Sequence, residues 1–227
     1  MTVKKFIAIS AAVLATATTT VSAASDAEFS IDFVSAYVFR GADLGDESVQ
    51  PGFGMSLLDG AISVGTWANF DIDSSEFNEI DYFFGIPIPL GEDSPVSAEI
   101  GYTEYVYNEG GEADREPYFS FGFGDASLLL AYGIGGAIED LLYVELGYGT
   151  SIAVSEDLSI DLGAALGYVD PDEGESGFNH LTISAGTGIA IPDTDFSVSL
   201  GVTYIYETDD EVQEVGEDFY FTVGTAL

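Results

Sequence analysis

The sequence predicts an all-β fold, a transmembrane antiparallel up-and-down β-barrel of about twelve strands. Three observations support this prediction. Apolar residues recur at every second position in successive segments, which is the period of a strand with one apolar face. The connections between these segments alternate between long or acidic stretches and shorter turns. The face opposite the apolar one consists mostly of Gly, Ser, Ala and Thr instead of charged residues.

The first 24 residues have the pattern of a secretory signal peptide. Lys4 and Lys5 precede the apolar run 6–14, and small residues follow up to Ala24. A basic start, a short apolar middle and a small-residue end are typical of cleaved export signals. We therefore assign residues 1–24 to a signal peptide and residues 25–227 to one outer-membrane barrel domain. The later sequence contains no run of roughly 20 apolar residues, the length that a membrane-spanning helix needs.

Twelve segments have the alternation expected of strands. It is most regular in residues 117–124, where Phe119, Phe121 and Phe123 alternate with mainly small residues. The predicted strands are 29–40, 49–58, 62–72, 79–88, 96–102, 117–124, 128–135, 142–154, 158–168, 180–191, 196–206 and 219–227. Ten or fourteen strands remain open alternatives, because the segment 136–140 and the last strand have the weakest boundaries.

The connections between the predicted strands form two series. The long or acidic connections are 41–48, 73–78, 108–116, 136–140, 170–179 and 207–218. The shorter turns are 59–60, 91–95, 124–126, 155–157 and 192–195. Bacterial outer-membrane barrels have an even strand number, short periplasmic turns and longer outside loops. The pattern therefore predicts that both ends of the barrel domain lie on the periplasmic side.

Composition excludes several classes of protein. The chain has no cysteine, so it can form neither disulfides nor a thiolate metal site. Without Lys4 and Lys5, two arginines face 40 acidic residues, a formal net charge of −38. Such a chain repels nucleic acid phosphates. A hydrophobic content of 47% distinguishes it from acidic disordered proteins.

A soluble β-sandwich or lipocalin-like binding protein is the structural alternative. Such a protein points its apolar face inward and covers its outer face with charged side chains. Small residues on the second face, acids in the connections and aromatic residues near strand ends instead favour lipid outside and water inside. We predict an aromatic lipid-facing girdle of the kind found at membrane interfaces. Its residues are Tyr37, Phe39, Tyr82, Phe119, Phe121, Tyr168, Tyr204 and Tyr206.

Three short motifs lie near the start of the predicted barrel. Residues 35–41 read Ser-Ala-Tyr-Val-Phe-Arg-Gly, residues 51–54 read Pro-Gly-Phe-Gly, and residues 64–70 read Val-Gly-Thr-Trp-Ala-Asn-Phe. In these motifs the chain resembles the TorF-type putative porins of Gram-negative bacteria. The resemblance implies an outer-membrane barrel with a transport role, and it brings no catalytic residues.

Charged residues on the second face are the candidate pore-lining groups. They are Asp32, Arg40, Asp81, Glu99, Glu145, Asp161 and His180. Strand direction places Asp32, Glu99 and Asp161 toward the periplasmic mouth and the other four toward the outside. Acidic rings in a pore favour cations. A lumen plugged by side chains remains an alternative, because eight-stranded barrels are filled and open channels become secure near sixteen strands.

Arg40 and His180 each allow two interpretations. Arg40 either narrows the pore or forms a structural salt bridge with lumen carboxylates. His180, with Thr182 and Ser184 on its face, suggests a Ser/His hydrolase resembling the outer-membrane phospholipases. These side chains face away from lipid, and a third orienting residue is not evident. We therefore expect no enzyme activity, no catalytic residue, no cofactor and no metal site.

These observations predict a passive outer-membrane channel for small solutes with a preference for cations. The alternative is a closed structural or adhesin-like barrel whose acidic outer loops bind ions. The expected partners are the lipid bilayer, lipopolysaccharide, and small solutes or cations, but not nucleic acid. The sequence leaves the transported solute, the gating and the oligomeric state open.

Overall fold

A closed antiparallel barrel accounts for nearly all of the regular structure in the computed structural model, which describes residues 27–91, 94–108, 110–155, 158–209, 212 and 219–227. The predicted signal peptide lies outside these residues. Among the described residues twelve strands form the wall, which confirms the predicted fold and strand number. The wall strands are β1 (Ala27–Val34), β4 (Ser48–Leu57), β5 (Ile62–Asp71), β6 (Glu76–Pro87), β7 (Val96–Tyr107), β8 (Asp114–Phe123), β9 (Ala126–Tyr132), β10 (Leu142–Ala153), β11 (Ser159–Asp170), β12 (Gly177–Ala190), β13 (Ser197–Glu207) and β14 (Phe219–Ala226).

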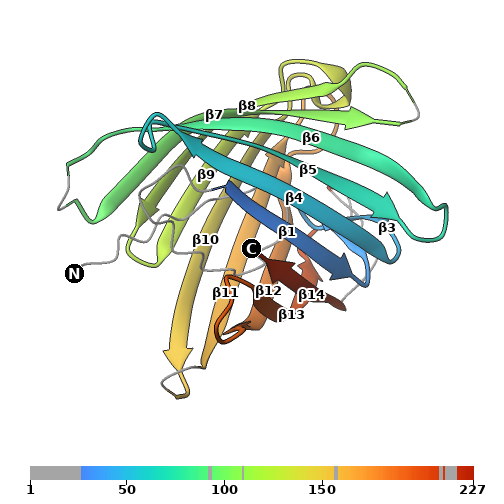
Figure 1. Cartoon of the computed structure of the whole chain (residues 1–227). Helices are drawn as coiled ribbons and strands as arrows, with labels where there is room; N and C mark the ends of the chain where they lie inside the picture. The colour runs from blue at the N-terminus through green and yellow to red at the C-terminus, as the bar shows by residue number, and fades with distance from the viewer. Residues whose placement is uncertain (1–26, 92–93, 109, 156–157, 210–211, 213–218) are drawn as a thin grey trace.

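Each wall strand pairs with its neighbours in chain order, and β1 closes the sheet by pairing with both β4 and β14 (Figure 1). At the seam, Phe29 and Leu227 exchange two backbone hydrogen bonds of 3.0 and 2.9 Å. Closure leaves the wall without a free sheet edge. The described part contains one short 3₁₀ helix, η1 (Gly136–Ile138), and no helix with the length and apolar character to cross a membrane.

The connections define two ends of the barrel. We call the end with connections 35–47, 72–75, 108–113, 133–141, 171–176 and 208–218 the loop end. We call the opposite end, with connections 58–61, 88–95, 124–125, 154–158 and 191–196, the turn end. Ala27 pairs with Met55 beside a turn-end connection, so β1 starts and β14 finishes at the turn end. The prediction of a long connection at 73–78 is wrong, because β6 begins at Glu76 and leaves a tight turn at 72–75.

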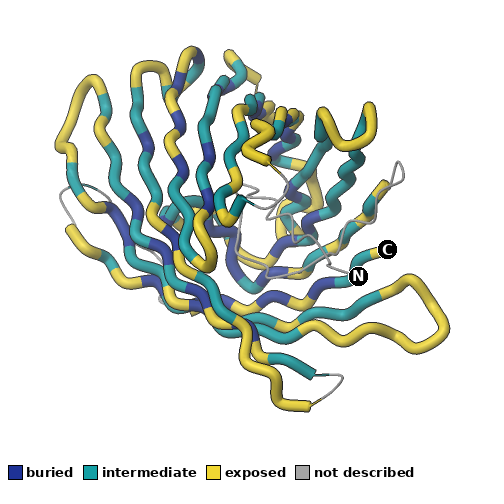
Figure 2. The backbone as a smooth tube through the Cα atoms, turned by 90° about the vertical axis from the view of Figure 1, so that its left-hand side faces the viewer, coloured by how far each residue is buried: buried dark blue, intermediate teal, exposed yellow. Residues whose placement is uncertain are grey.

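Apolar side chains cover the outer face of the wall and polar ones line the inner face. Buried and exposed residues alternate along the strands (Figure 2). On β13, Leu200 and Tyr206 are exposed, whereas Thr203 and Ile205 are buried. Exposed large apolar side chains occur on every wall strand except β4 and β5, for example Phe29, Leu146, Ile183 and Phe221. The barrel thus turns its apolar face outward, opposite to a soluble sandwich.

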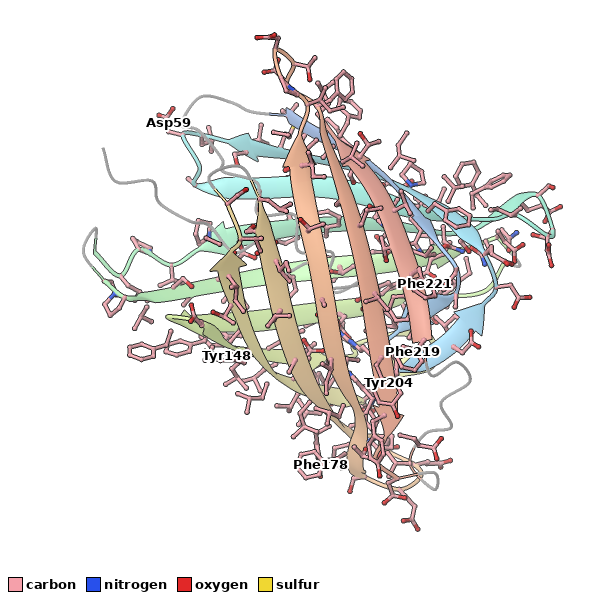
Figure 3. The ribbon with its side chains drawn as sticks, turned by 90° about the horizontal axis from the view of Figure 1, so that it is seen from below. Asp59, Tyr148, Phe178, Tyr204, Phe219 and Phe221 are labelled. Atoms are coloured by element: carbon pink, nitrogen blue, oxygen red, sulfur yellow. The ribbon has the colours of Figure 1, made fainter. Side chains whose placement is uncertain are left out.

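Aromatic pairs occupy the outer face near the loop end of β11–β14. Tyr204 packs on Phe219 with ring centroids 4.7 Å apart, and Tyr168 packs on Phe178 at 5.6 Å. Figure 3 shows Phe178, Tyr204 and Phe219 at the end of the barrel opposite Asp59. Six of the eight predicted girdle residues lie on the outer face: Tyr82, Phe119, Phe121, Tyr168, Tyr204 and Tyr206.

Two β-bulges interrupt the register of the described wall strands, both near the loop end. On β6, Glu79 faces Asn69 and Phe77 faces Phe70, so Asn78 is the extra residue. On β12, His180 faces Gly167 and Phe178 faces Tyr168, so Asn179 is the extra residue. A bulge re-aims side chains locally. It allows both Asn179 and His180 to be buried.

The predicted first strand, 29–40, is wrong beyond Val34. Val34 pairs with Ser48, so the chain leaves the wall after β1 and returns to the same point at β4. The intervening residues form β2 (Tyr37–Phe39) and β3 (Ala42–Gly45), which pair with each other in a separate two-stranded sheet. Alternation continues through Tyr37 and Phe39 because this segment is also extended. The sequence pattern therefore could not mark the exit from the wall.

The outer face gives a first testable prediction. The substitution to test is Leu146→Arg, because Leu146 is 57% exposed and lies near the middle of β10. In lipid vesicles we expect Leu146→Arg to lower the free energy of unfolding by about 2–4 kcal/mol, since a cation there must enter hydrocarbon. Urea titration in vesicles measures the change. The matched Leu58→Arg, in a turn, is expected to change it by less than about 0.5 kcal/mol. Equal small effects would mean that water covers the outer face.

Candidate functional site: a hairpin inside the barrel

The β2–β3 hairpin, residues Tyr37–Gly45, lies inside the loop end of the barrel, and we call it the inner hairpin (Figure 1). Tyr37 is only 2% exposed and Val38 only 5%. The side chains that surround the inner hairpin come from the inner faces of wall strands. Tyr37 and Phe39, predicted as lipid-facing, therefore belong to the interior, and that prediction is wrong.

One side of the inner hairpin contacts β5, β6 and β7. The Tyr37 hydroxyl donates a 2.5 Å hydrogen bond to Glu79 Oε2, and its ring lies 5.6 Å from that of Trp67. The Phe39 ring packs edge-on against Tyr105, with centroids 5.7 Å apart. Aromatic packing and charge-assisted hydrogen bonds hold this side in place.

The other side of the inner hairpin packs against β13 and β14. Val38 and the preceding Ala36 form one buried apolar cluster with Ile205 and Tyr220. Ile205 and Tyr220 are apolar side chains on the inner face, and their contact with the inner hairpin accounts for their position. Because its two sides touch opposite parts of the wall, the inner hairpin bridges the lumen.

The tip of the inner hairpin fits closely against β12. Arg40 and Gly41 both have positive φ, 51° and 81°, as the central residues of a type I′ turn require. A Cβ on Gly41 would lie 2.5 Å from His180 Cβ, so a side chain has no room there. The bulged Asn179 donates a 2.9 Å hydrogen bond from Nδ2 to the Arg40 carbonyl.

The Arg40 side chain makes a buried ion pair across the lumen. Its Nη1 and Nη2 donate to the two oxygens of Glu116 on β8 at 2.7 and 2.6 Å. The guanidinium also lies over the Tyr143 ring at 3.9 Å from its centroid, and Tyr105 donates to Glu116 at 3.2 Å. Glu116 is 1% exposed. Of the two interpretations of Arg40, the structure shows the salt bridge. Arg40 makes it from the turn of the inner hairpin and not from a wall strand.

Glu145 and His180 lie beside this ion pair, as their expected position toward the outside implies. Tyr143 donates to Glu145 Oε2 at 2.6 Å, and His180 Nε2 lies 4.0 Å from the same oxygen. The His180 ring is stacked on Tyr143, 6.4 Å between centroids. Arg40, Glu145 and His180 therefore share one cluster around Tyr143.

Asp81 lies on β6 on the same face as Glu79, and both carboxyls are buried. Asp81 Oδ1 has no hydrogen-bond partner among the described residues. Asp114 and Glu116 add two further buried carboxyls from β8. Asp114 accepts hydrogen bonds from the Tyr107 hydroxyl at 3.0 Å and from the backbone of Ala137. The inner face at the loop end thus concentrates acidic side chains around the guanidinium of Arg40.

Asp114, Glu116 and Glu79 are site residues that were not predicted from the sequence. Asp114 and Glu116 were expected in a connection, although they share the parity of the inward Tyr118. Extending the alternation of residues 117–124 backward would have found them.

The remaining candidate residues are separate from the inner hairpin. Asp32 on β1 lies against Gly224, and Asp161 on β11 is buried opposite Gly186. Glu99 on β7 accepts a 2.8 Å hydrogen bond from the Tyr118 hydroxyl. Glu99 and Asp161 lie near the turn-end starts of β7 and β11, whereas Asp32 lies two residues before Val34, where β1 ends.

Small residues on the inner face make room for side chains from neighbouring strands. The Phe83 ring lies over Gly65, and the Tyr118 ring lies over Gly101, where a Cβ would collide with it. Ser, Thr and Gly also line a small cavity between β12, β13 and β14. Aromatic side chains of the inner face therefore pack against glycines of the neighbouring strands.

The hydrolase interpretation finds no support in the contacts of His180. Its ring lies between Tyr143, Gly41 and Gly167, and its nearest acid is Glu145. Ser184 is buried four residues further along β12. In the described part of the chain, groups of three or more His, Asp or Glu residues placed to hold a metal ion do not occur.

The fit of Gly41 against His180 gives a second prediction. Gly41→Val is expected to destabilise the docked inner hairpin by about 1–3 kcal/mol, since it combines a collision with a strained positive φ. Trp67, the only tryptophan, reports this through its contact with Tyr37. Its emission should move to longer wavelength as water reaches the ring. Gly54→Val, where space is open, should leave the emission unchanged, and an unchanged Gly41→Val spectrum would contradict the assignment.

Comparison with solved structures finds outer-membrane proteins. The KdgM porin in complex with disordered oligogalacturonate has a TM-score of 0.52 and 11% identity, with 88% of this chain and 96% of that chain covered. The NanC porin has a TM-score of 0.52 and 8% identity, covering 89% and 99%. Outer membrane phospholipase A from Escherichia coli has a TM-score of 0.44 and 12% identity, covering 89% and 90%. At such identities the likeness shows the fold alone.

Comparison of the sequence with family models identifies one that covers most of the chain. It matches residues 17–215 and is described as "Bacterial protein of unknown function (Gcw_chp)". The curated proteins give no match. With its outer-membrane porin fold, the chain belongs to the Gcw_chp family of bacterial proteins.

Proposed function

We propose that this protein is a channel of the outer membrane for passive diffusion of small solutes, with a preference for cations. The observation that carries the proposal is the orientation of the closed wall, apolar outside and acid-rich inside. The fold shared with the KdgM and NanC porins supports a channel. The structure of the first of these is a complex with disordered oligogalacturonate.

The proposal includes the location and the lipid partners of the chain. Residues 1–24 direct export, the turn end lies in the periplasm, and the loop end faces outward toward lipopolysaccharide. The apolar outer face matches the hydrocarbon of a bilayer. The resemblance of residues 35–70 to the TorF-type putative porins is consistent with this role.

Preference for cations follows from the charges on the inner face. Glu79, Asp81, Asp114, Glu116 and Asp161 are buried carboxyl groups, and Arg40 supplies the opposing positive charge. Walls of low dielectric constant focus the field of such groups, which lowers the energy of a cation in the lumen and raises that of an anion. Glu99 and Asp161 extend the same sign toward the turn end, and Asp32 adds a further carboxyl group on β1.

A closed structural or adhesin-like barrel is the second candidate, and the inner hairpin favours it. The inner hairpin occupies the loop end of the lumen and is held on both sides. Recording in planar bilayers separates the two functions. A channel gives discrete current steps, whereas a permanently plugged barrel stays silent.

Selectivity gives the third prediction. In a salt gradient the wild type is expected to show a cation-selective reversal potential. Replacing Asp32, Glu99 and Asp161 together by their amides should lower the cation-to-anion permeability ratio by about threefold or more, because each carboxylate removed weakens the field along the path.

The control removes the same charge from the turn-end surface. Asp59, Asp125 and Asp195 are exposed in turns, and their replacement by Asn should change the ratio far less. An anion-selective wild type, or equal effects of both triple variants, would contradict the proposed preference.

A further inference from the structure

We propose that the inner hairpin is a displaceable gate, with the Arg40–Glu116 ion pair as the contact that holds it closed. The proposal rests on the proposed channel function and adds a mechanism to it. In the structure the gate is docked, and the lumen is narrowed at the loop end. Displacement of the inner hairpin toward the outside would widen the same path.

The wall is complete without the inner hairpin. Val34 and Ser48, which flank the excursion 35–47, are directly paired between β1 and β4. β2 and β3 form ladder hydrogen bonds with each other and with no wall strand among those described. The inner hairpin can therefore leave its position without breaking the backbone ladder that closes the barrel.

Side chains, not the sheet, hold the inner hairpin in the lumen. The contacts are the Tyr37–Glu79 hydrogen bond, the apolar cluster around Val38, and the two-pronged Arg40–Glu116 pair. The backbone adds the bond from Asn179 to the Arg40 carbonyl. Contacts of this kind form and break together, which is the property of a two-state element.

The ion pair is suited to a reversible contact. Burial of two charges costs hydration energy that their attraction only partly returns, so a docked and a hydrated pair are close in free energy. Loss of one partner leaves the other charge buried without compensation and is strongly unfavourable. A two-stranded hairpin is only marginally stable alone. The positive φ of Arg40 lowers the stability of the inner hairpin further. Removal of Glu116's charge should therefore release the inner hairpin.

Channel recording tests the gate through Glu116→Gln. This variant keeps the shape of the side chain and removes its charge, so we expect the occupancy of the larger conductance state to rise by about tenfold or more. Glu104→Gln is the matched control. Glu104 pairs with Arg115 at 3.8 Å on the outer face, away from the inner hairpin. In Glu104→Gln the larger conductance state should therefore have the same occupancy as in the wild type.

Trypsin gives a second measurement that does not depend on current. After residue 24 the chain has two trypsin sites, Arg40 and Arg115. The wild type and Glu104→Gln should resist cleavage after Arg40, because the docked tip is enclosed by His180 and Glu116. In Glu116→Gln, cleavage should yield a fragment that begins at Gly41.

An engineered disulfide distinguishes release of the inner hairpin from misfolding of the barrel in Glu116→Gln. The chain has no native cysteine, and Val38 and Ile205 share one buried cluster. Adding Val38→Cys and Ile205→Cys to the Glu116→Gln variant should return the conductance and trypsin resistance to wild-type values on oxidation. Reduction should restore the released state, which a misfolded barrel would not do.

Failure of the gate and failure of the channel give different results. In a deletion variant, Ala36–Asp46 is replaced by Asn-Gly, which joins β1 to β4 directly. The gate alone is overturned if the wild type, Glu116→Gln and the deletion variant have the same nonzero conductance. In that case the wild type and Glu116→Gln should also resist trypsin equally. Silence in all of them overturns the proposed function and the gate together.

Discussion

Closure of the sheet between β1 and β14 is the constraint on which the rest of this structure depends. It satisfies the backbone of every wall strand within the barrel, and it fixes which face of each strand points outward. Because side chains alternate along a strand, one choice of face applies to the whole wall. Apolar side chains then cover the outside, and carboxylates, hydroxyls and glycines border the inside.

Alternation and connection pattern were enough to predict the twelve-stranded closed wall, because both reflect local geometry that survives folding. The same reasoning failed where the chain leaves the wall. Tyr37 and Phe39 continue the alternation of β1, yet their partners are Glu79 and Tyr105, which lie far along the sequence. Such pairings depend on closure and are invisible in a local pattern.

The site was predicted in part for a similar reason. Glu145 and His180 meet near Tyr143, as their face and strand direction indicated, whereas Arg40 reaches the same ring from the turn of the inner hairpin. Glu116 was assigned to a connection, because a run of polar residues at a strand end resembles a loop. The bulge at Asn179, which turns its side chain toward the Arg40 carbonyl, has no signature in the periodicity. In the proposed transport role, the acidic interior accounts for the preference for cations and the inner hairpin for gating.

The orientation of the wall is tested most directly by spin labels placed one at a time along β13 in lipid vesicles, since the chain contains no native cysteine. The account predicts that labels at Val198, Leu200 and Val202 collide mainly with oxygen dissolved in lipid. Labels at Ser199, Gly201 and Thr203 should collide mainly with a water-soluble nickel complex. The opposite phase, or water access at every position, would contradict a barrel with lipid outside and an aqueous interior.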